Sequence, residues 1–224
     1  MSSSLSIIVP VLNEAGCICA QLAALAPLRA RGAEVVVVDG GSDDDTVALC
    51  VDRADTVLVS PRGRARQMNA GAARARGDQL LFLHADTLLP AGGDSTIAHA
   101  LRHAHWGRFD VRIAGRARML PVVAVLINLR SRWTGIATGD QALFVRRASF
   151  DQAGGFPDQP LLEDVALSRR LRAMSRPACL HGRVTTSGRR WDRQGVWRTI
   201  LLMWQLRWRY WCGTPPDVLA RKYL

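Results

Sequence analysis

The chain has 224 residues, of which 48% are hydrophobic and 22% are charged, so it is long enough for one α/β domain with a full core and too apolar for a disordered segment. Arginine carries most of the net charge of +11, since Lys222 is the only lysine, and this charge suits nucleic acid, anionic lipid or a phosphorylated substrate. No apolar run reaches the roughly 18–20 residues that cross a bilayer. The best run, residues 119–127, contains Pro121.

The N-terminus and the cysteines carry the signals of location. Met1 is followed by three serines without a positively charged segment, which predicts no signal peptide. The five cysteines are odd in number and contain no C-x-x-C pair, which predicts reduced thiols in a cytoplasmic protein. A peripheral position at the inner membrane face stays open.

The first half of the chain alternates short apolar runs with helical patterns. It predicts strands at residues 5–11, 34–38, 56–59 and 79–83 and helices at residues 17–28 and 65–75. This alternation predicts a Rossmann-like, mostly parallel central sheet flanked by helices.

The second half is less regular. It predicts strands at residues 109–113, 141–145 and 184–187 and helices at residues 162–174 and 195–212. No repeat or linker interrupts the chain, so we predict a single domain over residues 1–224.

Polar residues follow three of the predicted strands. Asn13 and Glu14 follow the first strand, Asp39 the second and Asp86 the fourth, and ligands of open parallel sheets bind beyond these strand ends. The chain has neither a G-x-G-x-x-G turn nor a P-loop. We therefore expect a divalent cation, Mg²⁺ or Mn²⁺, to bind Asp86 and hold a diphosphate in their place.

Four motifs carry a resemblance to a known family. They are IIVPVLNE, VVVVDGGSDDDT, LLFLHADT and LLEDVALSRRL, in this order. Together they resemble glycosyltransferase family 2, whose members have the GT-A fold, over about residues 6–171. The segment TGDQALF, with GGF and HADT, resembles a small bacterial subgroup labelled as arsenosugar-biosynthesis transferases.

The resemblance implies a division of the domain and a role for each site residue. Residues 1–115 would form the nucleotide-sugar half, residues 116–190 the acceptor and catalytic half, and residues 191–224 an amphipathic helical tail. Asp39 would accept a hydrogen bond from the base, the imide N–H of uracil, and Asp86 would hold the metal. The nucleotide-sugar residues would be Pro10, Asn13, Glu14, Asp39, His84 and Asp86, and the acceptor side would hold Asp140, Gln141 and Glu163.

His84 and Arg66 each have two interpretations. His84 stands where the family has the first acid of its D-x-D motif; it would donate to a ribose hydroxyl or ligate a metal, and simple packing at the strand end is the alternative. Arg66, close to Arg64 at a predicted helix start, is a candidate for binding the phosphates of the donor, and a solvated basic surface is its alternative.

The resemblance makes Asp164 the general base that removes the proton of the acceptor hydroxyl. A position in the first turn of a helix would favour its ionised form, and a plain helix-end acid is the alternative. One base and direct displacement imply inversion at the anomeric carbon. The predicted activity is thus inverting, metal-dependent transfer from a UDP-sugar to an acceptor hydroxyl.

The predicted tail helix carries a tryptophan stripe. Its members follow a four-three spacing, which places them on one face: Trp197, Leu201, Trp204, Trp208 and Trp211. An interfacial membrane helix, packing on the domain and contact with a second copy are all open. Upstream, SGRRW resembles the Q-x-x-R-W motif of processive members, but Ser187 replaces the glutamine, so polymerisation is not inferred.

Two other function classes remain. A nucleic-acid-binding protein would explain the charge, but no motif for it is present, and no nucleic acid is expected as a partner. A nucleotidyltransferase can share this type of sheet, but it typically has a lysine-rich phosphate loop, and residues 13–16 contain no lysine. The sugar, the acceptor and the oligomeric state are not readable from the sequence.

Overall fold

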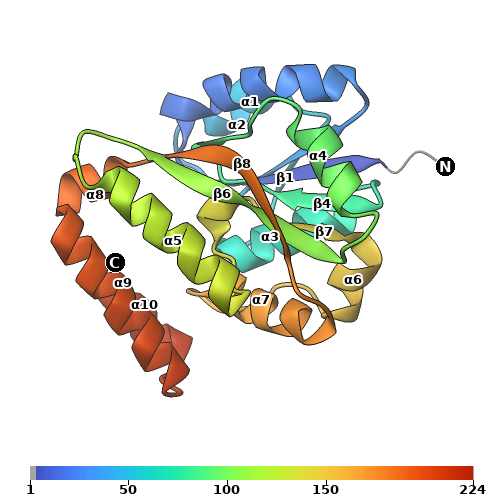
Figure 1. Cartoon of the computed structure of the whole chain (residues 1–224). Coiled ribbons are helices and arrows are strands. Elements are labelled where there is room, and N and C mark those ends of the chain that lie inside the picture. Colours follow the sequence, from blue (N-terminus) through green and yellow to red (C-terminus); the bar gives the residue numbers. More distant parts are fainter. Residues whose placement is uncertain (1–3, 224) are drawn as a thin grey trace.

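The computed structural model describes residues 4–223. Within them, eight strands form one sheet in the order β3-β2-β1-β4-β7-β6-β8-β5 (Figure 1). The strands are β1 (Leu5–Val11), β2 (Glu34–Asp39), β3 (Thr56–Val59), β4 (Gln79–Phe82), β5 (Thr87–Leu88), β6 (Trp106–Ala114), β7 (Phe144–Arg146) and β8 (Ala178–Ser187).

The first half of the sheet is parallel, as predicted. Strand β1 pairs in parallel with β2 and β4, and β2 pairs in parallel with β3. Strands β1 and β2 are buried on both faces, which accounts for their continuous apolar sequences. Val11 lies beside Asp39 in the register of β1 and β2, so the segments that follow these strands begin at one edge of the sheet.

The second half makes the sheet mixed. Strand β7 is antiparallel to β4 and β6, β8 is parallel to β6, and β5 is antiparallel to β8. The prediction of a strand from residue 141 was wrong. Gly139–Gln141 form a 3-10 turn, Ala142 has φ 50°, and β7 starts only at Phe144.

Helices pack on both faces of the sheet. They are α1 (Ala15–Ala30), α2 (Thr46–Cys50), α3 (Arg64–Arg74), α4 (Gly93–Ala100), α5 (Leu120–Thr134), α6 (Arg147–Gln152), α7 (Glu163–Met174), α8 (Arg189–Gln194), α9 (Val196–Trp211) and α10 (Pro216–Tyr223). Helix α5 was not predicted: Pro121, which argued against an apolar span, lies in its first turn, where its missing N–H breaks no helical hydrogen bond.

The alternation of side chains along β1 divides the core into two layers. Ile7 and Val9 face a cluster with α1, α4 and α5, whereas Ile8 faces a cluster with α3, α6 and α7. Figure 1 shows α1 and α4 on one side of the sheet and α3, α6 and α7 on the other. The fold is therefore a curled α/β sheet between two helical layers.

Helices α8, α9 and α10 form a C-terminal arm along one side of the domain (Figure 1). Leu206 of α9 is buried against Leu162 and Leu219, so this face of α9 holds the arm to the domain. The tryptophan stripe lies on the opposite, exposed face, which overturns the alternative that it packs on the domain. Between residues 4 and 223, no helix is both long and apolar enough to cross a membrane.

Candidate functional site

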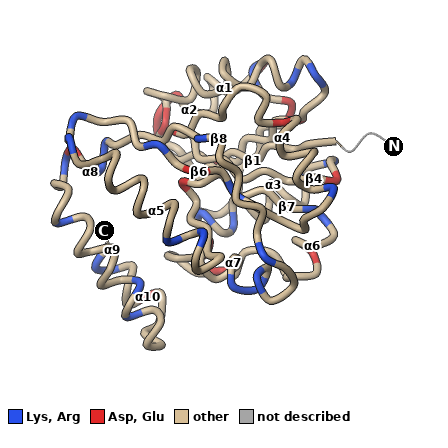
Figure 2. The backbone as a smooth tube through the Cα atoms, viewed as in Figure 1, with Lys and Arg blue, Asp and Glu red and all other residues tan. Residues whose placement is uncertain are grey.

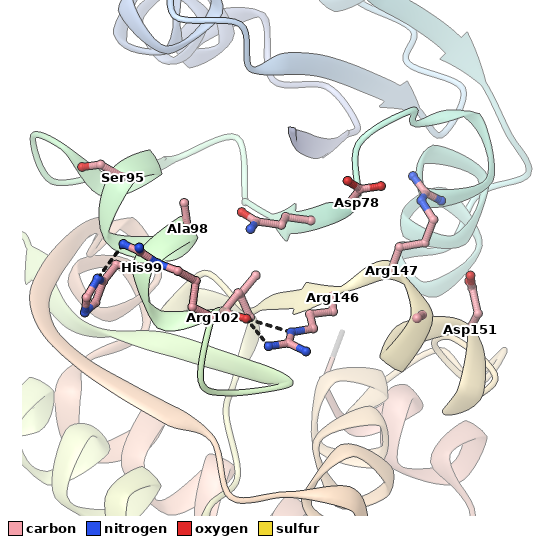
Figure 3. Close-up of a pocket in the computed structure, with 11 residues that line it drawn as sticks. Asp78, Ser95, Ala98, His99, Arg102, Arg146, Arg147 and Asp151 are labelled. Atoms are coloured by element: carbon pink, nitrogen blue, oxygen red, sulfur yellow. Dashed lines mark hydrogen bonds between the residues drawn. The ribbon is translucent and has the colours of Figure 1, made fainter. Parts of the chain in front are cut away.

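A cavity of about 900 Å³ lies where β4 begins, at the end of the strand opposite to Asp86 (Figure 3). Two of its arginines are bound to main-chain carbonyls. Arg146 donates to Leu101, and Arg147 donates to the carbonyls of Ala72, Ala75 and Gly77. These arginines therefore join β7 and α6 to the end of α3 and to neighbouring loops, and the cavity is not the candidate site.

The segments after β1 and β2 interlock at the carboxyl edge of the sheet. The Asn13 main-chain N–H donates to Ser42 Oγ at 2.9 Å, and Asn13 Oδ1 accepts from the Asp43 N–H at 2.9 Å. Asn13 has φ 54°, a conformation that asparagine tolerates better than most residues. Pro10 lies in β1 beside Val38. These contacts hold the segments that follow β1 and β2 together at the strand ends.

Asp39 is 2% exposed and already holds the loop that follows it. Its Oδ2 accepts the N–H groups of Gly41 at 2.8 Å and Ser42 at 2.9 Å, and its Oδ1 accepts the Ser42 hydroxyl. A carboxylate oxygen can accept two hydrogen bonds, so Oδ1 retains capacity for one ligand donor. Asp39 thus fixes the turn and keeps the capacity to accept one further hydrogen bond.

Arg189 joins the polar residues of two strand ends. Its Nη2 lies 3.2 Å from Glu14 Oε2 and 3.3 Å from Asp86 Oδ2. Asp86 opens into a cavity of about 610 Å³, lined by Asp86, Ser187, Arg189, Arg190, Arg193 and Gln194. The sequence prediction missed these arginines as binding residues, although they lie in and after the SGRRW segment. One carboxylate among three guanidinium groups is a suitable surface for a diphosphate.

His84 lies two residues before Asp86 in the same loop. Among the described residues, its Nε2 atom is buried without a hydrogen-bond partner. Burial, together with the charge of Arg64, lowers the pKa of His84 to about 3, so the ring is neutral. A Cβ atom on Gly139 would lie 2.5 Å from His84 Nε2, so this contact requires glycine.

Gly139 also contacts Asp164. Its N–H donates to Asp164 Oδ2 at 2.6 Å, and the Val165 N–H donates to Asp164 Oδ1 at 2.6 Å. Burial raises the pKa of Asp164 although these hydrogen bonds oppose the shift. The expectation that the helix start would favour the ionised form is thus outweighed by burial. A basic carboxylate is better suited to accept a proton.

Glu163, at the start of α7, is 4% exposed. Burial and then the charge of Asp164 raise its pKa to about 7, against the influence of Arg64, whose Nη1 lies 3.8 Å from Glu163 Oε1. Gly139 lies against both Asp164 and His84, which is two residues before Asp86, so the acids at the start of α7 neighbour the loop that holds Asp86.

The structure brings Arg64 rather than Arg66 to these acids. Arg66 Nε pairs with Asp158 Oδ1 at 2.8 Å, and both side chains are more than half exposed. Its role in phosphate binding remains a prediction that this geometry does not favour. The sequence at the start of α3 predicts an arginine near the site, but it does not show which of the two arginines lies beside Glu163.

The two acceptor-side candidates of the 3-10 turn differ in their surroundings. Gln141 is fully buried, and its Oε1 accepts from the Thr138 N–H at 3.2 Å and hydroxyl at 3.3 Å. Its side chain therefore holds the turn itself. Asp140 Oδ1 is buried without a partner within residues 4–223, so Asp140 is the one with binding capacity left.

The family model described as glycosyl transferase family 2 matches residues 6–119, just over half of the chain. The chain belongs to this family. The match contains β1, β2 and β4 with the residues at their ends, among them Asp39 and Asp86. No curated protein matches the chain in sequence.

Solved structures extend the likeness in fold over most of the chain. TarS of S. aureus, residues 1–349, has a TM-score of 0.63 at 19% identity over 83% of this chain and 60% of its own. The mannosyltransferase PcManGT of Pyrobaculum calidifontis has a TM-score of 0.59 at 24% identity, over 83% of this chain and 57% of its own. Glucosyl-3-phosphoglycerate synthase of Mycobacterium tuberculosis has a TM-score of 0.59 at 20% identity, over 81% of this chain and 70% of its own. These likenesses confirm the GT-A fold, and the chain spans 60% of the TarS fragment that it matches.

The raised pKa of Glu163 predicts a pH-dependent stability. An acid whose pKa is higher in the folded than in the unfolded state stabilises the fold below the unfolded pKa, and this contribution is lost as pH rises through the folded value. The shift from 4.5 to about 7 corresponds to about 3 kcal/mol. We expect Glu163→Gln to raise the melting temperature relative to wild type at about pH 8 and not at about pH 4.5.

The matched control for this measurement is Asp151→Asn, because Asp151 is an exposed acid on α6. Its melting temperature should follow that of the wild type across the same range. A difference between Glu163→Gln and wild type that stays constant with pH would contradict the assignment of a raised pKa to Glu163.

Proposed function

We propose that the chain transfers a sugar from a nucleoside-diphosphate sugar, most specifically a UDP-sugar, to an acceptor hydroxyl with inversion. One observation carries the proposal. Asp86 opens into an arginine-lined cavity, and Gly139 lies against both Asp164 and His84, which is two residues before Asp86. A diphosphate site beside a basic carboxylate is the arrangement that such a transfer needs.

The donor side follows from the strand ends. Related folds have been solved with UDP-GlcNAc, with UDP and with GDP-Man. By analogy, Asp39 accepts the imide N–H of a uracil, while Pro10, Asn13 and Glu14 lie along the nucleotide. Arg189 and Arg193 lie in the Asp86 cavity, where their charge suits the two phosphates.

A divalent cation fits this cavity only when a diphosphate shares it. Among residues 4–223, no cluster of three or more His, Cys, Asp or Glu side chains could hold a metal. Mg²⁺ commonly takes one or two carboxylates and completes its coordination with substrate phosphates, and Asp86 supplies one such carboxylate. When bound, Mn²⁺ or Mg²⁺ would offset the charge that develops on the leaving diphosphate.

The acceptor side relies on Asp164. The N–H groups of Gly139 and Val165 fix both of its oxygens, and its raised pKa favours uptake of the acceptor proton. Asp140 lies in the same turn as Gly139 and is available to bind the acceptor. With a single base, attack occurs on the face opposite the leaving diphosphate, which inverts the anomeric carbon. Membership of the arsenosugar-type subgroup remains part of this proposal.

Asp39→Ala is expected to weaken UDP binding by about 1.5–3 kcal/mol, the scale of a hydrogen bond to a charged group. Calorimetric titration measures this change. Because Asp39 also holds its loop, the control is Ser42→Ala, which removes the two hydrogen bonds of the Ser42 hydroxyl, to Asp39 and from the Asn13 N–H, and keeps the Asp39 carboxylate. Equal UDP affinities for Asp39→Ala and Ser42→Ala would show that Asp39 acts through the loop alone.

A further inference from the structure

An apolar surface runs along two helices outside the site. On α9 it consists of the tryptophan stripe, whose five side chains are 63–68% exposed. On α5 it continues with Val122, Val125, Leu126, Leu129 and Trp133, and Trp133 is 83% exposed. Soluble monomers rarely expose apolar side chains in such a contiguous set, and rimmed patches of this kind mark interaction surfaces.

The two helices meet at a groove. A cavity of about 690 Å³ is lined by Arg130 of α5 and by Trp204, Gln205, Arg207, Trp208 and Trp211 of α9. Figure 1 shows α5 and α9 running along the same side of the molecule. The groove thus has tryptophan walls and two guanidinium groups.

The two arginines of the groove lack anionic partners within residues 4–223. Arg130 Nε and Nη2 and Arg207 Nε are buried without hydrogen-bond partners, and the remaining nitrogen of the Arg130 fork, Nη1, lies 3.4 Å from the Ile136 carbonyl. Burial, together with the charge of Arg207, lowers the pKa of Arg130 to about 10. Two neighbouring guanidinium groups with three buried, unpaired nitrogen atoms form a site for an added anion.

The ligand of this groove must combine an anionic and an apolar part. An inorganic anion would leave the tryptophans exposed, and an apolar ligand would leave the arginines unpaired. A second copy of the chain would bring like charges together, since arginines also accompany the exposed stripe along α9 (Figure 2). A lipid with a phosphate headgroup satisfies both parts, because arginine binds phosphate in a fork and tryptophan suits the membrane interface.

We propose that the groove between α5 and α9 binds an anionic membrane lipid, with its phosphate between Arg130 and Arg207 and the tryptophan stripe in the bilayer interface. This goes beyond the transfer reaction and gives the chain a membrane-docking face. Arg130 Nη1 contacts the carbonyl of Ile136, three residues before Gly139, so the groove lies beside the turn of the proposed acceptor side.

The test is co-sedimentation of the full chain with vesicles of phosphatidylcholine, with and without phosphatidic acid. The wild type should bind the anionic vesicles. Trp204→Ser with Trp208→Ser should lower the partition coefficient at least roughly tenfold; both side chains are exposed, so folding is preserved. Arg130→Gln with Arg207→Gln should lower it at least about tenfold more than a charge-matched control does.

That control is Arg198→Gln with Arg221→Gln, which removes the same charge from exposed positions on α9 and α10 outside the groove. If the two double arginine variants lose vesicle binding equally, a general charge effect explains the binding, and the proposal is overturned. So would a wild type that binds no vesicles, or one that forms a dimer which the tryptophan substitutions dissociate. UDP affinity, measured on the same proteins, reports on the transfer site separately.

Discussion

Asp164→Asn is expected to lower sugar transfer by at least roughly 10²-fold while UDP affinity stays near that of the wild type, as for removal of a general base. Asparagine keeps the shape of the side chain, and its carbonyl oxygen can accept one of the two main-chain N–H groups that now bind Asp164. The asparagine side chain cannot take up the proton of the acceptor hydroxyl. The measurement is the transfer rate at saturating donor, with UDP affinity from calorimetry.

Glu163→Gln is the matched control, because Glu163 precedes Asp164 in α7 and is also a buried acid with a raised pKa. Its carboxylate faces Arg64 rather than the Gly139 N–H, so we expect most of the activity to remain. If Glu163→Gln is the inactive variant and Asp164→Asn is active, the base is Glu163. If both variants are active, neither acid is the base.

The sheet was predictable where single strands are buried on both faces. The strand at residues 5–11 agrees with the structure residue for residue, because a continuous β-branched run bounded by polar residues is typical of a fully buried strand. Helix α5 was missed because its exposed face is apolar too, which removes the helical period from its sequence. Only its packing on β6 shows that it is a helix of the domain.

The candidate site was predictable in part, for a similar reason. Asp39 and Asp86 follow strands directly, so the sheet itself brings them to one edge. Arg189 lies 103 residues after Asp86 and reaches it through the pairing of β8 with β5, which local sequence does not reveal. The need for glycine at position 139 was not predictable by itself, because it arises from the close contact of Gly139 with His84.

The two arginines of the groove were also not predictable from local sequence. Arg130 and Arg207 belong to helices that are far apart in the sequence, and each alone resembles an ordinary charge on a helix surface. The tryptophan stripe was predictable because its spacing is local. Its exposure was not, since spacing defines a face but not what covers that face.

The most direct test of the proposed donor site is UDP binding to wild type and Asp86→Asn, measured by calorimetry with Mn²⁺ and with EDTA. We expect Mn²⁺ to raise the UDP affinity of the wild type at least about tenfold, since the cation takes oxygens from both Asp86 and the diphosphate. Asp86→Asn should lose this gain but retain the weaker affinity seen in EDTA, because the Asp86 cavity keeps its arginines. Equal affinities in Mn²⁺ and EDTA, or an undiminished gain in Asp86→Asn, would contradict the donor site placed here.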